Sequence, residues 1–161
     1  MSRAWFIFSA VYLLFALPLS FIDSRKFRIP VSAVFAGIVV VLISRFYFIN
    51  LPFILNLKIS AFAVITSFLA FFCVRVFSDS AVGWDDILFG IMTSFYSGFY
   101  ENLVAVVFAA LLGILFYLTD SVISKKIKRN DNILKPIFAI PLVPFITAGA
   151  VFTKILFYVI A

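Results

Sequence analysis

Hydrophobic residues occur along this chain in six runs, which are separated by short polar segments. A helix needs about 20 apolar residues to cross the roughly 30 Å hydrocarbon core of a bilayer, and most of these runs approach that length. We therefore predict membrane-spanning helices over residues 4–22, 31–49, 59–77, 87–100, 103–118 and 137–161. The fourth run is short for this thickness, so we expect its helix to start deep in the membrane or in a region lined by protein.

The polar segments between the runs predict the loops. Residues 23–30 form a short basic loop that closes with Pro30, a residue suited to the first turn of the next helix. Residues 50–58 are interpreted as a second loop. Glu101 and Asn102 are interpreted as a tight turn between the fourth and fifth helices.

Two prolines, Pro141 and Pro144, lie near the start of the last run. Each proline removes an amide donor, so this helix is expected to begin broken or kinked. The break could open room for a ligand or could be a simple kink. No soluble domain or linker is apparent, and we interpret residues 1–161 as a single transmembrane domain of the all-α, polytopic class.

Composition agrees with this pattern. The chain is 65% hydrophobic and 12% charged, with a mean hydropathy of +1.22, whereas about a quarter of the residues are charged in a typical soluble domain. The formal net charge of +6 would suggest nucleic acid as the partner of a soluble protein. In a membrane protein, the enrichment of cations on the cytoplasmic side explains it better.

The sequence also excludes several kinds of chemistry. It has no histidine and a single cysteine, Cys73. A Ser-His-Asp triad, a Cys-His pair, a zinc site of clustered His or Cys and a structural disulfide all lack their residues. We expect no metal or cofactor, and any catalysis must use carboxylates, hydroxyls, lysine or arginine.

The cations predict the orientation of the chain. With six helices, one side carries nine of the 13 cations, namely Arg25, Lys26, Arg28, Arg75, Lys125, Lys126, Lys128, Arg129 and Lys135. The other side carries four: Arg3, Arg45, Lys58 and Lys154. The first side is therefore expected to be cytoplasmic, with the N-terminus outside. Arg45 is expected to reach the membrane surface from near the end of its helix.

Carboxylates gather on the same side as most cations. Asp23 ends the first predicted helix, and Asp85 and Asp86 begin the fourth, after Gly83. The simplest interpretation of this second stretch is a glycine turn followed by a helix start, where aspartate is favoured. The four other acids are interpreted as solvated or charge-balancing: Asp79, Glu101, Asp120 and Asp131.

The second interpretation of these carboxylates is catalytic. Two aspartates that lie close together can share one proton, so that one acts as a base toward water and the other as an acid toward a carbonyl oxygen. Such a pair can hydrolyse a peptide bond without histidine, cysteine or metal.

Three motifs occur in order along the chain. The first is Asp23 followed by a basic segment that ends in Ile29-Pro30. The second is Gly83-Trp84-Asp85-Asp86, and the third is Ile140-Pro141-Leu142-Val143-Pro144-Phe145. Together they resemble the motifs of the type IV prepilin peptidases and the archaeal preflagellin peptidases, which are GxGD-type intramembrane aspartyl proteases. The resemblance covers nearly the whole chain and is to the short form of the family, without the N-terminal methylation domain.

This resemblance implies that Asp23 and Asp86 are the catalytic pair. It also implies the substrates, which are prepilin-like proteins whose short basic leader peptide is removed at the cytoplasmic face of the cell membrane. One departure concerns the motif itself, because Asp85 stands where the family has the second glycine. Counting four places from Gly83 favours Asp86 over Asp85. Where family members often carry a lysine two residues later, this chain has Leu88.

The alternative function is a membrane assembly factor or small transporter that keeps the fold without the catalysis. Asp85 in place of glycine is its main support, because it could stiffen the segment that presents Asp86. A transporter is expected to carry ionisable groups near the middle of the membrane. Apart from Arg45 and Arg75 near helix ends, the predicted helices contain none.

Overall fold

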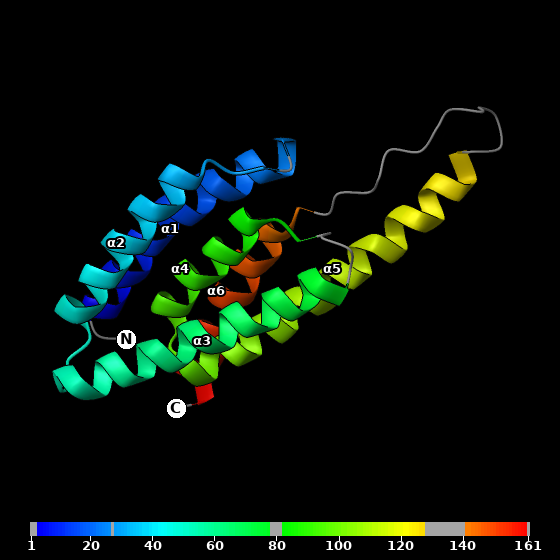
Figure 1. The fold of residues 1–161 in the computed structure, drawn as a ribbon. Coiled ribbons are helices and arrows are strands. Elements are labelled where there is room, and N and C mark those ends of the chain that lie inside the picture. The colour runs from blue at the N-terminus through cyan, green and yellow to red at the C-terminus, as the bar shows by residue number, and fades with distance from the viewer. Residues whose placement is uncertain (1–2, 27, 78–81, 128–140, 161) are drawn as a thin grey trace.

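All regular secondary structure in the described part of the chain is helical. The computed structural model describes residues 3–26, 28–77, 82–127 and 141–160 (Figure 1). The helices are α1 (Arg3–Lys26), α2 (Val31–Phe48), α3 (Phe53–Phe77), α4 (Trp84–Ser97), α5 (Phe99–Ile127) and α6 (Leu142–Ile160). The predicted all-helical fold is confirmed.

The helices divide by length into membrane-spanning elements and a short central one. By length and composition, α1, α2 and α3 can each cross a membrane, and α5 and α6 contain shorter apolar stretches. The prediction of a polytopic membrane protein is confirmed. Helix α4 has only 14 residues, which corresponds to about 21 Å at 1.5 Å per residue. The fourth helix is therefore short, as its sequence predicts.

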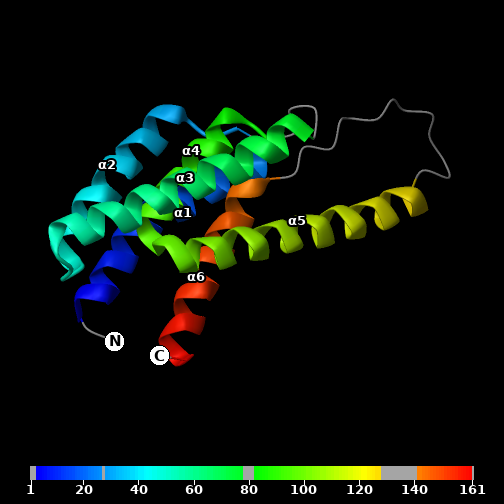
Figure 2. The same ribbon diagram turned by 60° about the horizontal axis from the view of Figure 1, so that its bottom comes forward.

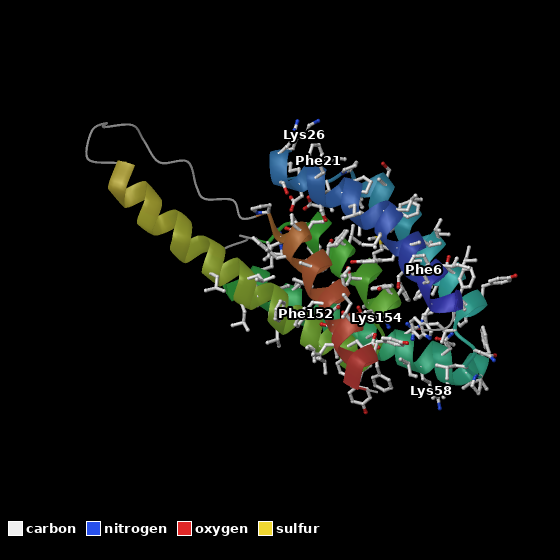
Figure 3. The ribbon with its side chains drawn as sticks, turned by 180° about the vertical axis from the view of Figure 1, so that it is seen from behind. Phe6, Phe21, Lys26, Lys58, Phe152 and Lys154 are labelled. Atoms are coloured by element: carbon white, nitrogen blue, oxygen red, sulfur yellow. The ribbon has the colours of Figure 1, made fainter. Side chains whose placement is uncertain are left out.

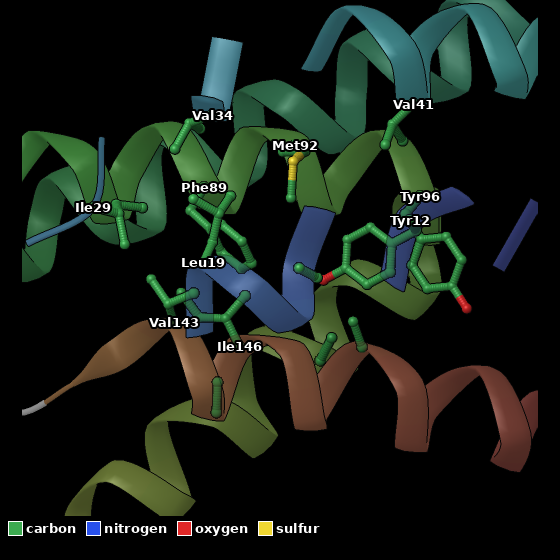
Figure 4. Close-up of a cluster of buried hydrophobic side chains, with 14 of the residues drawn as sticks. Tyr12, Leu19, Ile29, Val34, Val41, Phe89, Met92, Tyr96, Val143 and Ile146 are labelled. Carbon is green, nitrogen blue, oxygen red and sulfur yellow. The ribbon is translucent and has the colours of Figure 1, made fainter. Parts of the chain in front are cut away.

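Helix α4 lies at the centre of the bundle and packs against each of the other five helices (Figures 1 and 2). Its side chains at Phe89, Met92 and Tyr96 are buried. Figure 4 shows them between Leu19 of α1 on one side and Val41 of α2 on the other. A short helix can sit there because its apolar side chains are covered by protein rather than by lipid.

Aromatic and hydroxyl groups hold α1 against α4. The rings of Tyr12 and Tyr96 stack with their centroids 4.1 Å apart, as Figure 4 shows. Their hydroxyls are paired across the same interface: that of Tyr12 lies 3.1 Å from Thr93 Oγ1, and that of Tyr96 lies 3.0 Å from Ser9 Oγ. Buried tyrosines need such partners, so the contacts fix how far α4 sits along α1.

The outer surface and the two ends of the bundle agree with a membrane environment. Large apolar side chains such as Leu14 and Ile43 are exposed on the outside. Lys26 and Lys58, which the sequence assigns to opposite sides of the membrane, lie at opposite ends of the bundle (Figure 3). Arg45 is an exception to the predictions, because it is only 3% exposed and turns inward instead of reaching the surface.

Several predicted boundaries are wrong. Helix α1 continues to Lys26, so half of the predicted loop at 23–30 is helical, and α5 continues to Ile127, beyond the predicted end at residue 118. Helix α3 begins at Phe53, so most of the predicted loop at 50–58 is helical. Glu101 and Asn102 lie in the first turn of α5, and the turn between α4 and α5 is made by Gly98 alone. Gly98 has φ 84° and ψ −178°, a conformation that is essentially restricted to glycine.

The backbone at Gly98 gives a direct test of this junction. Gly98→Ala is expected to lower the free energy of unfolding by about 1–3 kcal/mol, because alanine is strained at this φ and ψ. Thermal unfolding in detergent measures the change. Ser97→Ala is the matched control, because the Ser97 hydroxyl has no hydrogen-bond partner among the described residues. Equal stability of Gly98→Ala and wild type would contradict the described turn.

Candidate active site

The structure brings three of the sequence-predicted acids together at one end of the bundle. Asp23 lies near the end of α1, and Asp85 and Asp86 lie in the first turn of α4. They interact electrostatically: the charges of Asp23 and Asp85 both act on Asp86, and the charge of Asp85 acts on Asp23. Asp23 lies more than sixty residues before the other two in the sequence, so the packing of α1 against α4 brings it to them.

Asp23 is buried against the start of α6. It is 4% exposed, and its Oδ2 accepts a hydrogen bond of 3.0 Å from the backbone N–H of Val143. Val143 lies in the first turn of α6, where backbone amides have no partner within their own helix. Pro144 fits this turn because its missing N–H would be unpaired there anyway. The two prolines therefore flank the amide that binds Asp23.

Asp86 caps its own helix. It is the third residue of α4, and its Oδ2 accepts a hydrogen bond of 2.9 Å from the N–H of Gly83. This is the carboxylate half of a capping box, and Gly83 has no side chain to supply the other half. The bond holds the Asp86 carboxyl over the N-terminal end of α4, which favours negative charge.

Asp85 binds a different segment. Its Oδ2 accepts a hydrogen bond of 3.1 Å from the N–H of Ile29, in the connection between α1 and α2. Ile29 is itself buried. Asp85 therefore ties this connection to the start of α4. Each of the three carboxylates accepts a hydrogen bond from the backbone N–H of a different segment. Asp85 therefore has a structural contact that neither Asp23 nor Asp86 makes.

Gly83 is needed for space rather than for flexibility. Its φ of −72° and ψ of 160° are open to any residue, so the sharp glycine turn that the sequence suggests is not present. A Cβ atom at this position would lie 2.1 Å from Asp85 Oδ1 and 3.3 Å from Asp86 Oδ2. A larger residue would have to displace the Asp85 carboxylate.

Arg75 supports the segment that leads into α4, a contact that sequence reasoning missed. Its Nη1 donates a hydrogen bond to the carbonyl oxygen of Val82, and its guanidinium lies 5.0 Å from the centre of the Trp84 ring. The hydrogen bonds from Val143 and Ile29 were also missed, because any residue but proline carries a backbone N–H. The one signal for the Arg75 contact in the sequence is that Arg75 lies close to Gly83 along the chain.

The remaining acids are not part of this cluster. Glu101 forms an ion pair with Lys154 at the opposite end of α4, which agrees with its interpretation as charge-balancing. Several residues singled out in the sequence lie outside the described part of the chain: Asp79, Lys128, Arg129, Asp131, Lys135 and Ile140. The side chain of Asp120 is also not described. Across the described residues, no group of three or more His, Cys, Asp and Glu side chains is arranged to hold a metal ion.

A cavity of about 510 Å³ also lies away from the aspartates. It is bounded by the first turns of α1 and the second half of α6, and its lining includes Trp5, Phe6, Tyr96, Glu101 and Lys154. Most of the lining is apolar. Glu101 is the one carboxylate among its lining residues.

The chain matches the model of the type IV leader peptidase family over residues 10–118. The match spans 109 of 161 residues, about two thirds of the chain, and includes Asp23, Asp85 and Asp86. No curated protein and no solved structure matches the chain.

The contact between Asp85 and Ile29 can be tested by hydrogen exchange. In Asp85→Ala, exchange of the Ile29 amide is expected to rise roughly tenfold or more, because a hydrogen bond to a charged acceptor contributes about 1.5–3 kcal/mol. Hydrogen–deuterium exchange in detergent micelles measures this rate. Asp86→Asn is the control, because Asp86 binds Gly83 and not Ile29. An unchanged Ile29 rate in Asp85→Ala would show that the contact is absent.

Proposed function

Because the chain belongs to the type IV leader peptidase family and is thereby a protease, we propose that it is an aspartic endopeptidase of the membrane. Its proposed substrates are prepilin-like proteins, from which it removes the short basic leader peptide. Asp23 and Asp86 are the proposed catalytic pair, and the reaction uses water without a metal or cofactor.

One observation carries this proposal: Asp23 and Asp86 come from separate helices and interact electrostatically at one end of the bundle. A solvated surface acid has no need of a specific backbone donor, yet Asp23 is buried on Val143 and Asp86 binds Gly83. Both carboxyls use Oδ2 in these bonds. Within the described residues, Oδ1 of each has no hydrogen bond and is left for a water molecule.

The chemistry follows from this arrangement. One carboxylate takes a proton from the water, whose oxygen attacks the carbonyl carbon of the scissile bond, and the other carboxyl gives its proton to the carbonyl oxygen. The tetrahedral intermediate then collapses. The C–N bond breaks as the departing amine takes up the proton that the first carboxylate received, and one hydroxyl of the intermediate returns a proton to the second carboxylate as the new carboxyl group forms. The pair is left with one shared proton, ready for another turnover.

Asp86, rather than Asp85, is the proposed second catalytic residue. Asp85 is occupied by Ile29 and fills the space over Gly83. This makes Asp85 a positioning residue, which locates the connection after Asp23 relative to the helix that carries Asp86. The aspartate that replaces the second glycine of the family motif therefore supports the site and need not abolish it.

The proposed orientation places the aspartates at the cytoplasmic face of the cell membrane. It is supported by the charges, because nine of the 13 cations lie on the side that the sequence assigns to Asp23 and Asp86. Of these, Arg25, Lys26, Arg28 and Arg75 are described and lie in or beside the segments that form the site. A leader peptide would meet the aspartates on this side before its apolar segment crosses the membrane.

Coexpression with a panel of prepilin-like substrates tests the proposal. Asp23→Asn and Asp86→Asn are each expected to reduce cleavage by about a thousandfold, because each removes a group that transfers protons. Asp85→Asn is expected to retain cleavage, because its amide oxygen can still accept the Ile29 hydrogen bond. The shift of the substrate band on a gel measures the extent of cleavage.

The three variants also separate the alternatives. Loss of cleavage in Asp85→Asn, with Asp86→Asn active, would reverse the assignment of the second catalytic residue. If none of the substrates is cut by folded wild-type protein in the membrane, the noncatalytic assembly factor or transporter replaces the peptidase as the preferred function.

A further inference from the structure

The C-terminal end of α4 is buried in the bundle and needs hydrogen-bond donors. The last four carbonyls of a helix have no partner within the helix. In α4, the carbonyl of Ser94 is satisfied by the N–H of Gly98 at 3.0 Å. The carbonyls of Phe95, Tyr96 and Ser97 remain. In a bilayer no bulk water reaches them, so other groups of the protein must supply the donors.

Arg45 of α2 supplies one donor. Its Nη1 donates a hydrogen bond of 2.7 Å to the carbonyl of Phe95, and its Nε donates one of 2.8 Å to Asn56 Oδ1 of α3. Arg45 and Asn56 are 3% and 1% exposed. A buried arginine without partners is costly, but both of these contacts are short and come from different helices. The side chain is therefore fixed against the end of α4.

Lys154 of α6 supplies a second donor from another side. Its Nζ donates a hydrogen bond of 3.2 Å to the carbonyl of Ser97 and forms an ion pair with Glu101. The ammonium also lies 4.2 Å from the centre of the Trp5 ring of α1. Figure 3 shows Lys154 in the half of α6 that lies away from Lys26.

We name Arg45, Asn56, Glu101 and Lys154 the C-terminal clamp. The clamp contains two cations and one anion, so its net charge is +1. A positive charge is favourable beside the C-terminal end of α4, where the helix dipole is negative. Helices α1, α2, α3, α5 and α6 each contribute a contact to the clamp, so it holds α4 from several directions. The opposite end of the same helix carries Asp86, about 16 Å away at 1.5 Å per residue.

We propose that Arg45 and Lys154 are positioning residues for the reaction: by capping the C-terminal carbonyls of α4, they set the height of this helix in the bundle and so the place of Asp86 beside Asp23. This inference rests on the proposed peptidase function for its kinetic consequence. Helix α4 is short, and its first turn carries Asp86. A shift of its C-terminal end along the helix axis therefore moves Asp86 by a similar distance.

Steady-state cleavage of a leader-bearing substrate by purified protein tests the kinetic consequence. Arg45→Met and Lys154→Met are expected to lower kcat by roughly tenfold to a hundredfold, because a misplacement of about 1 Å can have an effect of that size. KM is expected to stay unchanged, because neither residue lies at the end of the bundle where the substrate is cut. Lys154→Arg is expected to restore kcat, since arginine can also donate to the Ser97 carbonyl.

Two control variants separate the clamp from other effects of losing charge. Lys58→Met removes an exposed cation from the same end of the bundle and is expected to leave kcat unchanged. The double variant Glu101→Gln/Lys154→Met removes the ion pair without leaving Glu101 unpaired. If the loss of kcat in Lys154→Met arises from the missing hydrogen bond to Ser97, the double variant shows the same loss of kcat. Recovery of wild-type kcat in the double variant would overturn the proposed role of Lys154.

Hydrogen exchange tests the same inference without a substrate, so its outcome is independent of the proposed function. A purely local role for the clamp predicts faster exchange only at Gly98, whose amide bonds Ser94. The positioning role predicts faster exchange also at Gly83 and Ile87, at the other end of α4. Wild-type rates at Gly83 and Ile87 in folded Arg45→Met and Lys154→Met would overturn it. If either methionine variant fails to fold, the same comparison is made with Arg45→Met/Asn56→Leu or Glu101→Gln/Lys154→Met, which removes the donor without leaving its side-chain partner unpaired.

Together, the cleavage and exchange measurements distinguish failure of the peptidase proposal from failure of the clamp proposal. Failure of wild type to cleave any substrate counts against the peptidase and leaves the exchange test of the clamp in force. Wild-type kcat and exchange in the clamp variants, with Asp86→Asn inactive, counts against the clamp alone.

Discussion

The whole structure depends on the burial of α4 within the bundle. A helix of 14 residues that packs against five other helices leaves unpaired backbone groups at each of its ends, and partners for several of them come from the protein itself. At the N-terminal end the partner of Gly83 is a carboxylate, and at the C-terminal end the partners of Phe95 and Ser97 are cations. These choices follow the dipole of the helix. The site and the clamp are two results of one constraint.

The same constraint explains why acidic groups can persist in so apolar a protein. Each of Asp23, Asp85 and Asp86 accepts a backbone amide that would otherwise be unpaired at a helix start or in a connection. Asp23 therefore stabilises the start of α6, Asp85 the connection between α1 and α2, and Asp86 the start of its own helix. The same side chains that hold these segments include the proposed catalytic pair.

The sequence predicts the helices, their number and the side on which the aspartates gather, because runs of apolar residues and the placement of cations determine them directly. It places the fourth helix correctly as short, and its resemblance to a family leads to the proposal that Asp23 and Asp86 are the catalytic pair. It does not predict the partners of these residues. The amides of Val143 and Ile29 carry no side-chain signal, and the inward turn of Arg45 depends on the position of Phe95 and Asn56. The single-residue turn at Gly98 was hidden because Glu101 and Asn102 are the more obvious polar break.

Helix α6 follows α1 to α5 in the chain, and this order has a consequence for biogenesis. Helices leave the ribosome in order, and α1 to α5 are complete before α6 is made. Until then Asp23 lacks the amide of Val143, and the carbonyl of Ser97 lacks Lys154. Asp23 and the C-terminal end of α4 therefore gain these contacts only after α6 has been made. Synthesis itself postpones assembly of the aspartate site, so a chain that stops short of α6 carries the proposed catalytic residues without the contacts that hold them in place.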